Sequence, residues 1–228
     1  EDVKTDLERM MRRAGNRSPG VPVYEPRIIS ENERTVTFIN VVGQTQKMLK
    51  DNLLRMPMYL DWPVKDRATW NEFKKRLDPN TPERWPSDWD AYVRKMNGKS
   101  EPLALEVGGF YLYLREWVGS ERILYMFYDD PGLVEDMVEQ IVYLETEIIK
   151  RTLKDIKIQR AEFAEDLAYK AGPLISPAMV RKFIVPRYKK ITDLLHSYGV
   201  DVIYLDSDGN LEQLVPLWLE AGINFIWP

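Results

Sequence analysis

Cysteine is absent from the 228-residue chain, and histidine occurs once, at His196. The missing thiols exclude disulfides, a cysteine nucleophile and any zinc site built on thiolates. A single histidine limits Ser-His-Asp chemistry to that residue and excludes metal sites made of several histidines. Any chemistry must therefore use carboxylates, tyrosines, arginines, lysines, bound water or a cofactor. The lack of cysteine also fits a reducing compartment, so we expect a cytoplasmic protein.

The chain also lacks a long apolar run and a basic stripe. Its longest apolar segments, such as LVPLWLEAG, are too short to span a bilayer, so we expect no membrane association. The net charge is −4 and the short basic runs fall on predicted helices, so we expect no nucleic-acid partner. No G-x-G-x-x-G motif follows a predicted strand, which argues against nucleotide binding.

The pattern of predicted secondary structure changes near residues 98–101. Residues 1–98 are irregular and rich in proline-punctuated loops. Within them, the β-branched run at 34–42 predicts a strand in a hairpin, and Trp70, Phe73 and Leu77 predict one face of a short helix. We expect this segment to pack on a more regular segment, residues 99–228, within one domain.

Residues 99–228 alternate predicted strands with predicted helices. Apolar runs predict buried strands at 102–110, 161–169, 200–205 and 223–227. Asp130-Pro131, Ser176-Pro177 and Asn210 predict the starts of the intervening helices. This alternation favours parallel strands, either in an α/β barrel or in an open doubly wound sheet.

Four parallel strands fall short of the eight in a closed (β/α)8 TIM barrel. They would also leave two unpaired sheet edges, which stable proteins avoid. We therefore expect part of a TIM barrel, either in a piece of a longer chain with sequence missing at both ends or with partner chains that cover the edges.

Acidic residues gather at the carboxyl ends of the predicted strands, where α/β barrels build their active sites. The second strand ends at Glu165 and Asp166, and the third ends at Asp206, with Asp208 close behind. Paired carboxylates shift each other's pKa, so that one can stay protonated and donate a proton. A group of acids can instead hold a hard metal ion through oxygen.

Several of these residues also have a structural interpretation. Asp208 begins an Asp-Gly-Asn sequence that is typical of a turn or a helix cap. Glu165 and Asp166 are adjacent, so only one faces the barrel axis; we favour Asp166, with a loop salt bridge as the alternative. Gly108 and Gly109 either let a ligand approach closely or only form the turn after the first strand.

Three aromatic residues and the histidine complete the set of candidates. Trp85 and Trp89 form either a lid over a flat ligand or the packing of a loop. Tyr169 lies just beyond the second strand, where its hydroxyl can hydrogen-bond to a substrate. We interpret His196 as structural, because it lies near a predicted helix C-terminus, where the dipole favours a cation.

Three stretches, residues 114–138, 164–188 and 199–228, resemble the uroporphyrinogen decarboxylase superfamily. They contain the strings YKAGPLISP and DSDGN, and the likeness is greatest to the divergent members that include corrinoid-linked methyltransferases. The likeness is close over the second half of the chain and loose over the first half. It implies an α/β barrel that binds its ligand at the carboxyl ends of the strands.

The resemblance implies two alternative reactions. The decarboxylases bind a tetrapyrrole with an arginine-rich N-terminal segment and an aspartate that orients the pyrrole nitrogens, and neither feature has a matching position here. The methyltransferases bind zinc through a His-x-Cys pair, and Asp206 and Asp208 stand at the matching positions. These substitutions allow an oxygen-ligated metal or no metal, rather than thiolate-bound zinc.

The sequence therefore predicts an enzyme that acts on a tetrapyrrole or transfers methyl groups with a corrinoid protein as partner. Asp166, Asp206 and Asp208 are the predicted acid–base or ligand-orienting groups, although the acid-rich rim argues mildly against an acidic tetrapyrrole. The predicted substrate contacts are Glu165, Tyr169, Gly108, Gly109 and Phe110. We expect no tightly bound cofactor or metal, and a homodimer is one assembly that the sequence allows. The alternative is a non-catalytic module that binds a small molecule or a corrinoid protein on the same barrel.

Overall fold

The computed structural model describes residues 7, 11, 19–51 and 56–227. The chain divides into two compact units, and we describe each by itself. Unit 1 comprises Glu1–Asp78 and Glu116–Ser120, and unit 2 comprises Pro79–Arg115 and Glu121–Pro228. The first division between the units falls after Asp78, which is earlier in the chain than the change of sequence pattern near residue 98.

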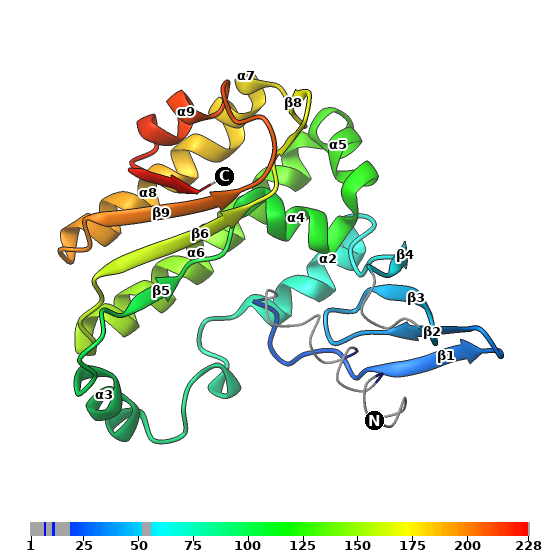
Figure 1. Ribbon diagram of the computed structural model, residues 1–228, viewed down its shortest axis with the longest axis horizontal. Coiled ribbons are helices and arrows are strands. Elements are labelled where there is room, and N and C mark those ends of the chain that lie inside the picture. Colours follow the sequence, from blue (N-terminus) through cyan, green and yellow to red (C-terminus); the bar gives the residue numbers. More distant parts are fainter. Residues whose placement is uncertain (1–6, 8–10, 12–18, 52–55, 228) are drawn as a thin grey trace. The chain divides into compact units, whose positions relative to one another are not determined.

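Unit 1 contains a four-stranded antiparallel sheet in the order β1-β2-β3-β4, drawn in blue and cyan in Figure 1. The strands are Arg27–Glu31, Thr35–Ile39, Thr45–Leu49 and Met58–Asp61. Val36, Phe38 and Met48 alternate with more exposed residues and form a buried cluster with Leu7 and Met11. The predicted hairpin strand is therefore confirmed as β2, which pairs with β3.

The predicted short helix of unit 1 is also confirmed, as α2 (Arg67–Lys74) followed by the 3₁₀ turn η1 (Lys75–Leu77). A capping box starts it, because Asp66 accepts the Thr69 N–H at 2.8 Å and the Thr69 hydroxyl accepts the Asp66 N–H at 3.0 Å. The predicted apolar face is buried, with the Trp70 ring 6.2 Å from that of Phe73.

Unit 2 is built on a parallel sheet in the order β5-β6-β9-β10. The strands are Ala104–Glu106, Arg160–Glu165, Val202–Ser207 and Phe225–Trp227, and all three pairings are parallel. The four predicted strands are thus confirmed. The order of strands across the sheet follows their order along the chain, without the reversal of a doubly wound sheet. Within the described residues the sheet is open, with β5 and β10 at its edges, so the closed barrel is not seen.

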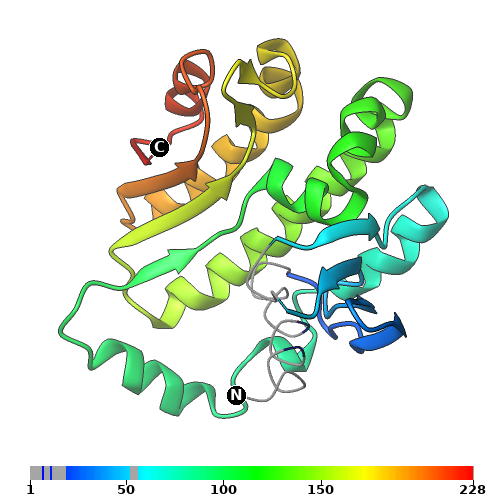
Figure 2. The same ribbon diagram turned by 45° about the vertical axis from the view of Figure 1, so that its right-hand side comes forward.

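The helices of unit 2 include two that cover one face of this sheet, α6 (Pro131–Asp155) and α8 (Val185–Ser197), as Figure 2 shows. Ala161, Phe163, Ile203 and Leu205 are buried and alternate with more exposed residues along β6 and β9. The remaining elements are η2 (Pro82–Arg84), α3 (Trp89–Asn97), α4 (Phe110–Val118), α5 (Ser120–Asp129), β7 (Ala168–Tyr169), β8 (Gly172–Pro173), α7 (Pro177–Met179), the π-helical η3 (Val180–Ile184) and α9 (Val215–Glu220).

Two of the three predicted helix starts are confirmed. Asp130 accepts the Leu133 N–H at 2.9 Å, and the Ser176 hydroxyl accepts the Met179 N–H at 3.2 Å. The third prediction, a helix that begins after Asn210, is wrong by several residues, because α9 begins at Val215. Pro216 follows in the first turn, where the backbone N–H groups have no partner within the helix and a missing N–H costs no hydrogen bond.

No helix in the described ranges is long and apolar enough to cross a membrane.

Candidate functional site

The candidate site lies where the strands of the parallel sheet end. Glu165 of β6 pairs with Ser207 of β9, and Asp206 pairs with Trp227 of β10. Three neighbouring strands therefore finish at one edge of the sheet, which we call the carboxyl edge. The pairing brings Asp166, Asp206 and Asp208 to this edge, as expected from parallel strands.

Glu165 points to the buried face of the sheet. Its Oε1 atom accepts the N–H groups of Phe110 and Tyr111 at 2.7 and 3.1 Å, and its Oε2 atom accepts that of Leu112 at 2.8 Å. The hydroxyl of Tyr188 donates to Oε1 at 2.7 Å. Burial raises the pKa of Glu165 to about 7, opposed by these hydrogen bonds. Because the carboxylate caps the N-terminus of α4, its contacts are structural, and we leave it out of the proposed site.

Asp166 takes part in a salt bridge, which is the alternative that the sequence left open. The Arg115 Nη2 atom lies 2.7 Å from the Asp166 Oδ2 atom, and both side chains are partly exposed. The ion pair orients the carboxylate while one side of it stays open to solvent. Asp166 can therefore still meet a ligand, with its direction set by Arg115.

The glycine pair after β5 serves close packing of the chain. A Cβ atom on Gly109 would lie 1.8 Å from the carbonyl oxygen of Ala164, and Gly108 has a φ of +54°. Phe110 is 1% exposed, and its ring meets that of Tyr188 edge-on at 4.8 Å between centroids. These predicted substrate contacts therefore belong to the packing of α4 against β6.

The DSDGN stretch contains the last two residues of β9 and the turn that follows them, and Asp206 and Asp208 are exposed. Gly209 has a φ of +94°, and a Cβ atom there would lie 2.7 Å from the carbonyl carbon of Ala168. The Asn210 N–H donates to the Tyr169 carbonyl at 3.0 Å, which holds the turn against β7. The stretch therefore forms a structural turn and also leaves both aspartates open to a ligand. The structural and the functional interpretation of these residues are compatible.

Asp206 lies on the sheet face opposite to α6 and α8. Its neighbours Leu205 and Ser207 are buried, so alternation directs Asp206 to the open side. A hollow of about 500 Å³ lies on this open side, lined by Arg160, Glu162, Val202, Tyr204, Phe225 and Trp227. None of these residues is among the predicted site residues, although the alternation of RAEFAE and VIYLDS contains the signal.

Charge and aromatic rings meet in this hollow. The Arg160 Nε atom lies 2.6 Å from the Glu162 Oε1 atom, and the rings of Tyr204 and Phe225 stack at 5.4 Å between centroids. The pKa of the Tyr204 hydroxyl is raised, first by burial and then by the carboxylates of Asp206 and Glu162.

Tyr169 is also exposed, at 60%, and the Lys170 Nζ atom lies 5.7 Å from the centre of its ring. Its hydroxyl is therefore accessible to a ligand. Such access is needed if Tyr169 is to form the predicted hydrogen bond to a substrate.

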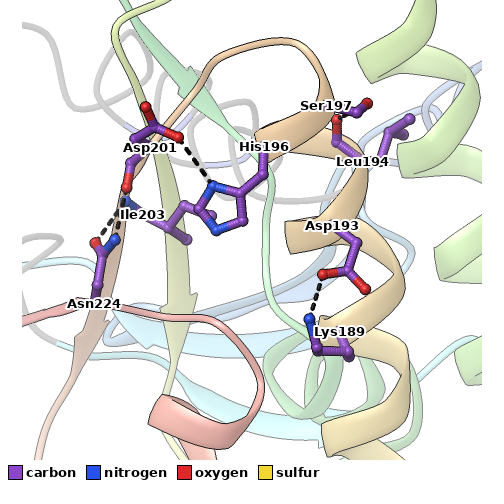
Figure 3. A network of polar contacts seen from close by, with 8 residues as sticks. All are labelled: Lys189, Asp193, Leu194, His196, Ser197, Asp201, Ile203 and Asn224. Atoms are coloured by element: carbon purple, nitrogen blue, oxygen red, sulfur yellow. Dashed lines mark hydrogen bonds and ion pairs between the residues drawn. The ribbon is translucent and has the colours of Figure 1, made fainter.

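His196 lies at the other end of the sheet, near the start of β9, as Figure 3 shows. Its Nδ1 atom is 3.3 Å from the Asp201 Oδ1 atom. Asn224 donates to the Asp201 carbonyl at 2.6 Å and accepts the Ile203 N–H at 2.9 Å, which ties the starts of β9 and β10 together. These contacts are those of a structural histidine.

Trp85 and Trp89 pack against α6. The Arg151 guanidinium lies 3.9 Å from the centre of the Trp85 ring, and Trp89 Nε1 donates to the Asp155 Oδ2 atom at 2.7 Å. These contacts match the interpretation of the two tryptophans as loop packing.

A thiolate zinc site does not fit these residues, because the chain has no cysteine. Across residues 19–51 and 56–227, with residues 7 and 11, no three His, Asp or Glu side chains are arranged to hold a metal ion. We therefore derive no chemical step through zinc.

Comparisons with known proteins identify a similar fold. No family model matches the sequence, and no curated protein matches it. The solved structure of a methyltransferase from Methanosarcina mazei resembles 75% of this chain with a TM-score of 0.52. The sequence identity is 14%, so the likeness is one of fold alone. The chain spans about half the length of that methyltransferase, since 49% of it is covered.

Proposed function

We propose that this chain is part of a methyl-transferring enzyme whose reaction takes place at the carboxyl edge. The observation that carries the proposal is the register of β6, β9 and β10. Asp206 is paired with Trp227, and Asp166 and Asp208 directly follow the last paired residues of β6 and β9. The likeness in fold to a methyltransferase supports the type of reaction.

We further propose that the parallel sheet is part of an α/β barrel. The strand order follows the chain order, α6 and α8 cover one face only, and the other face carries large side chains. This arrangement is expected of a barrel wall, whose inner face is lined by side chains from successive strands.

The aspartates have distinct proposed roles. When a methyl group leaves a donor, the electron pair of the broken bond stays on the donor heteroatom. Asp206 and Asp208 are exposed, so one of them can hold the donor. Asp166, held by Arg115, orients the donor, and Tyr169 donates a hydrogen bond to it. A corrinoid carried by a partner protein supplies or accepts the methyl group in this hypothesis.

Methyl transfer is favoured over decarboxylation of a tetrapyrrole. The neighbouring fold is that of a methyltransferase. In addition, the carboxyl edge presents three carboxylates, and Arg115 there is already paired with Asp166. Such an edge repels a substrate that itself carries several carboxylates.

The proposal is tested by measuring demethylation of methylcobalamin from its visible absorbance, and transfer from ¹³C-methyl donors by NMR. Asp206→Asn and Asp166→Asn are expected to lower turnover by about a hundredfold. The control is Asp193→Asn, an exposed aspartate of α8 that pairs with Lys189. No transfer from any donor by the unaltered chain would refute the proposal. That absence of transfer would favour the non-catalytic binding module. Turnover that survives both substitutions would refute the roles proposed for Asp166 and Asp206.

A further inference from the structure

The open face of the parallel sheet carries two rows of paired side chains. Glu106, Glu162, Tyr204 and Phe225 are register partners across β5, β6, β9 and β10. In the next row towards the carboxyl edge, Asp206 pairs with Trp227. We call these six residues, together with Arg160, the open sheet face. Paired residues of parallel strands point to the same side, so the two rows form one surface.

Two of the three aromatic rings of this surface are exposed in the part of the chain that the structure describes. Phe225 is 49% exposed and Trp227 is 59% exposed, whereas Ile203 and Leu205 on the opposite face are fully buried. The hollow beside the rings has about 500 Å³, which is within the range of about 300–1,000 Å³ seen for small-molecule sites.

The charge of the open sheet face is negative. Three carboxylates, those of Glu106, Glu162 and Asp206, stand against the single guanidinium of Arg160. Arg160 is engaged by Glu162 at 2.6 Å, which leaves Glu106 and Asp206 as excess negative charge. The raised pKa of Tyr204, caused by burial and then by nearby carboxylates, agrees with a negative potential at the rings.

We propose that the open sheet face binds a small methylated ammonium cation. Aromatic rings attract such cations through their negative faces, and the methyl groups add apolar contact. The exposed carboxylate of Asp206, next to Trp227, supplies the complementary charge. A neutral or anionic ligand would leave this excess charge unbalanced.

One part of the inference rests on the proposed function, namely that the bound cation is the methyl donor. In that step the methyl–nitrogen bond breaks and the electron pair stays on nitrogen as a neutral amine. The methyl group would go to a reduced, unmethylated corrinoid on the partner protein, which supplies the electron pair of the new bond. A neutral amine needs no proton to leave, so Asp206 would act here through its charge. Binding of the cation can be measured without the step.

The test is isothermal titration of the 228-residue chain with choline and with tetramethylammonium. The control ligand is 3,3-dimethylbutan-1-ol, the uncharged analogue of choline, which should bind at least about tenfold more weakly. Asp206→Asn, Trp227→Leu and Tyr204→Leu should each weaken choline binding by about tenfold, whereas Tyr204→Phe, which keeps the ring, should retain it. Tyr125→Leu alters a 61% exposed tyrosine of α5 and should leave binding unchanged.

Thermal denaturation of each variant separates loss of binding from loss of folding. Equal affinity for the neutral analogue, or no binding of either cation, would overturn the inference. So would a dimer that persists at all concentrations in sedimentation equilibrium and that Trp227→Leu dissociates, because a second copy would then cover this face. Cation binding without methyl transfer would leave the inference standing and refute the proposed function. Transfer from an oxygen-linked methyl donor without cation binding would refute the inference and leave the proposed function standing.

Discussion

Glu145 provides a test of how a buried carboxyl makes the unfolding free energy depend on pH. This residue of α6 is 5% exposed, and burial raises the pKa of its carboxyl to about 7, with Arg84 acting in the opposite direction. Since a pKa unit corresponds to about 1.4 kcal/mol, the difference from the ordinary value of 4.5 amounts to about 3 kcal/mol. The folded state binds the proton more tightly, so this contribution is fully present below pH 4.5 and is lost as the pH rises to about 7.

Glu145→Gln replaces the carboxyl by a neutral group of the same shape. At pH 4.5 the variant should match the unaltered chain, because both side chains are uncharged in the folded state. At pH 8 it should be more stable by about 3 kcal/mol, because no buried charge has to form. Urea denaturation followed by far-UV circular dichroism at both pH values measures the difference.

The control is Glu147→Gln, which alters a half-exposed carboxylate of the same helix that pairs with Lys150. Its effect should be small and should hardly change with pH. If Glu145→Gln changed the unfolding free energy equally at pH 4.5 and pH 8, the raised pKa of Glu145 would be refuted.

Two further predictions concern the junction of β6 and α4. Glu165→Gln should stabilise the chain at pH 8 by about 2 kcal/mol less than Glu145→Gln does, because its amide cannot accept hydrogen bonds at both positions; equal gains in urea denaturation would contradict the capping role. Gly109→Ala should cost about 3 kcal/mol or prevent folding, because its Cβ would overlap the Ala164 carbonyl. Gly199→Ala, where no atom lies within 4 Å of the added Cβ and only the φ of +79° opposes it, should cost about 1 kcal/mol, and equal thermal stabilities of the two variants would refute the steric argument.

Much of the fold follows from local patterns in the sequence. The four parallel strands, the capping residues Asp130 and Ser176 and the apolar face of α2 were all predictable, because each depends on neighbours a few residues away. Helix α4 was not predicted, and its contacts explain why. The carboxylate that caps its first turn belongs to Glu165, more than fifty residues further along the chain. A cap supplied from that distance leaves no local signal.

Local patterns in the sequence establish which residues end the strands, and the parallel topology then brings Asp166, Asp206 and Asp208 to one edge. The direction in which each side chain points depends instead on contacts between elements far apart in the sequence. Glu165 shares the buried face of β6 with Ala161 and Phe163, and its carboxylate is used in capping α4. Asp206 falls on the other face, beside Trp227, because strand pairing sets which side chains become neighbours. That pairing is a long-range property, so the row of rings and carboxylates appears only once β5, β6, β9 and β10 lie side by side.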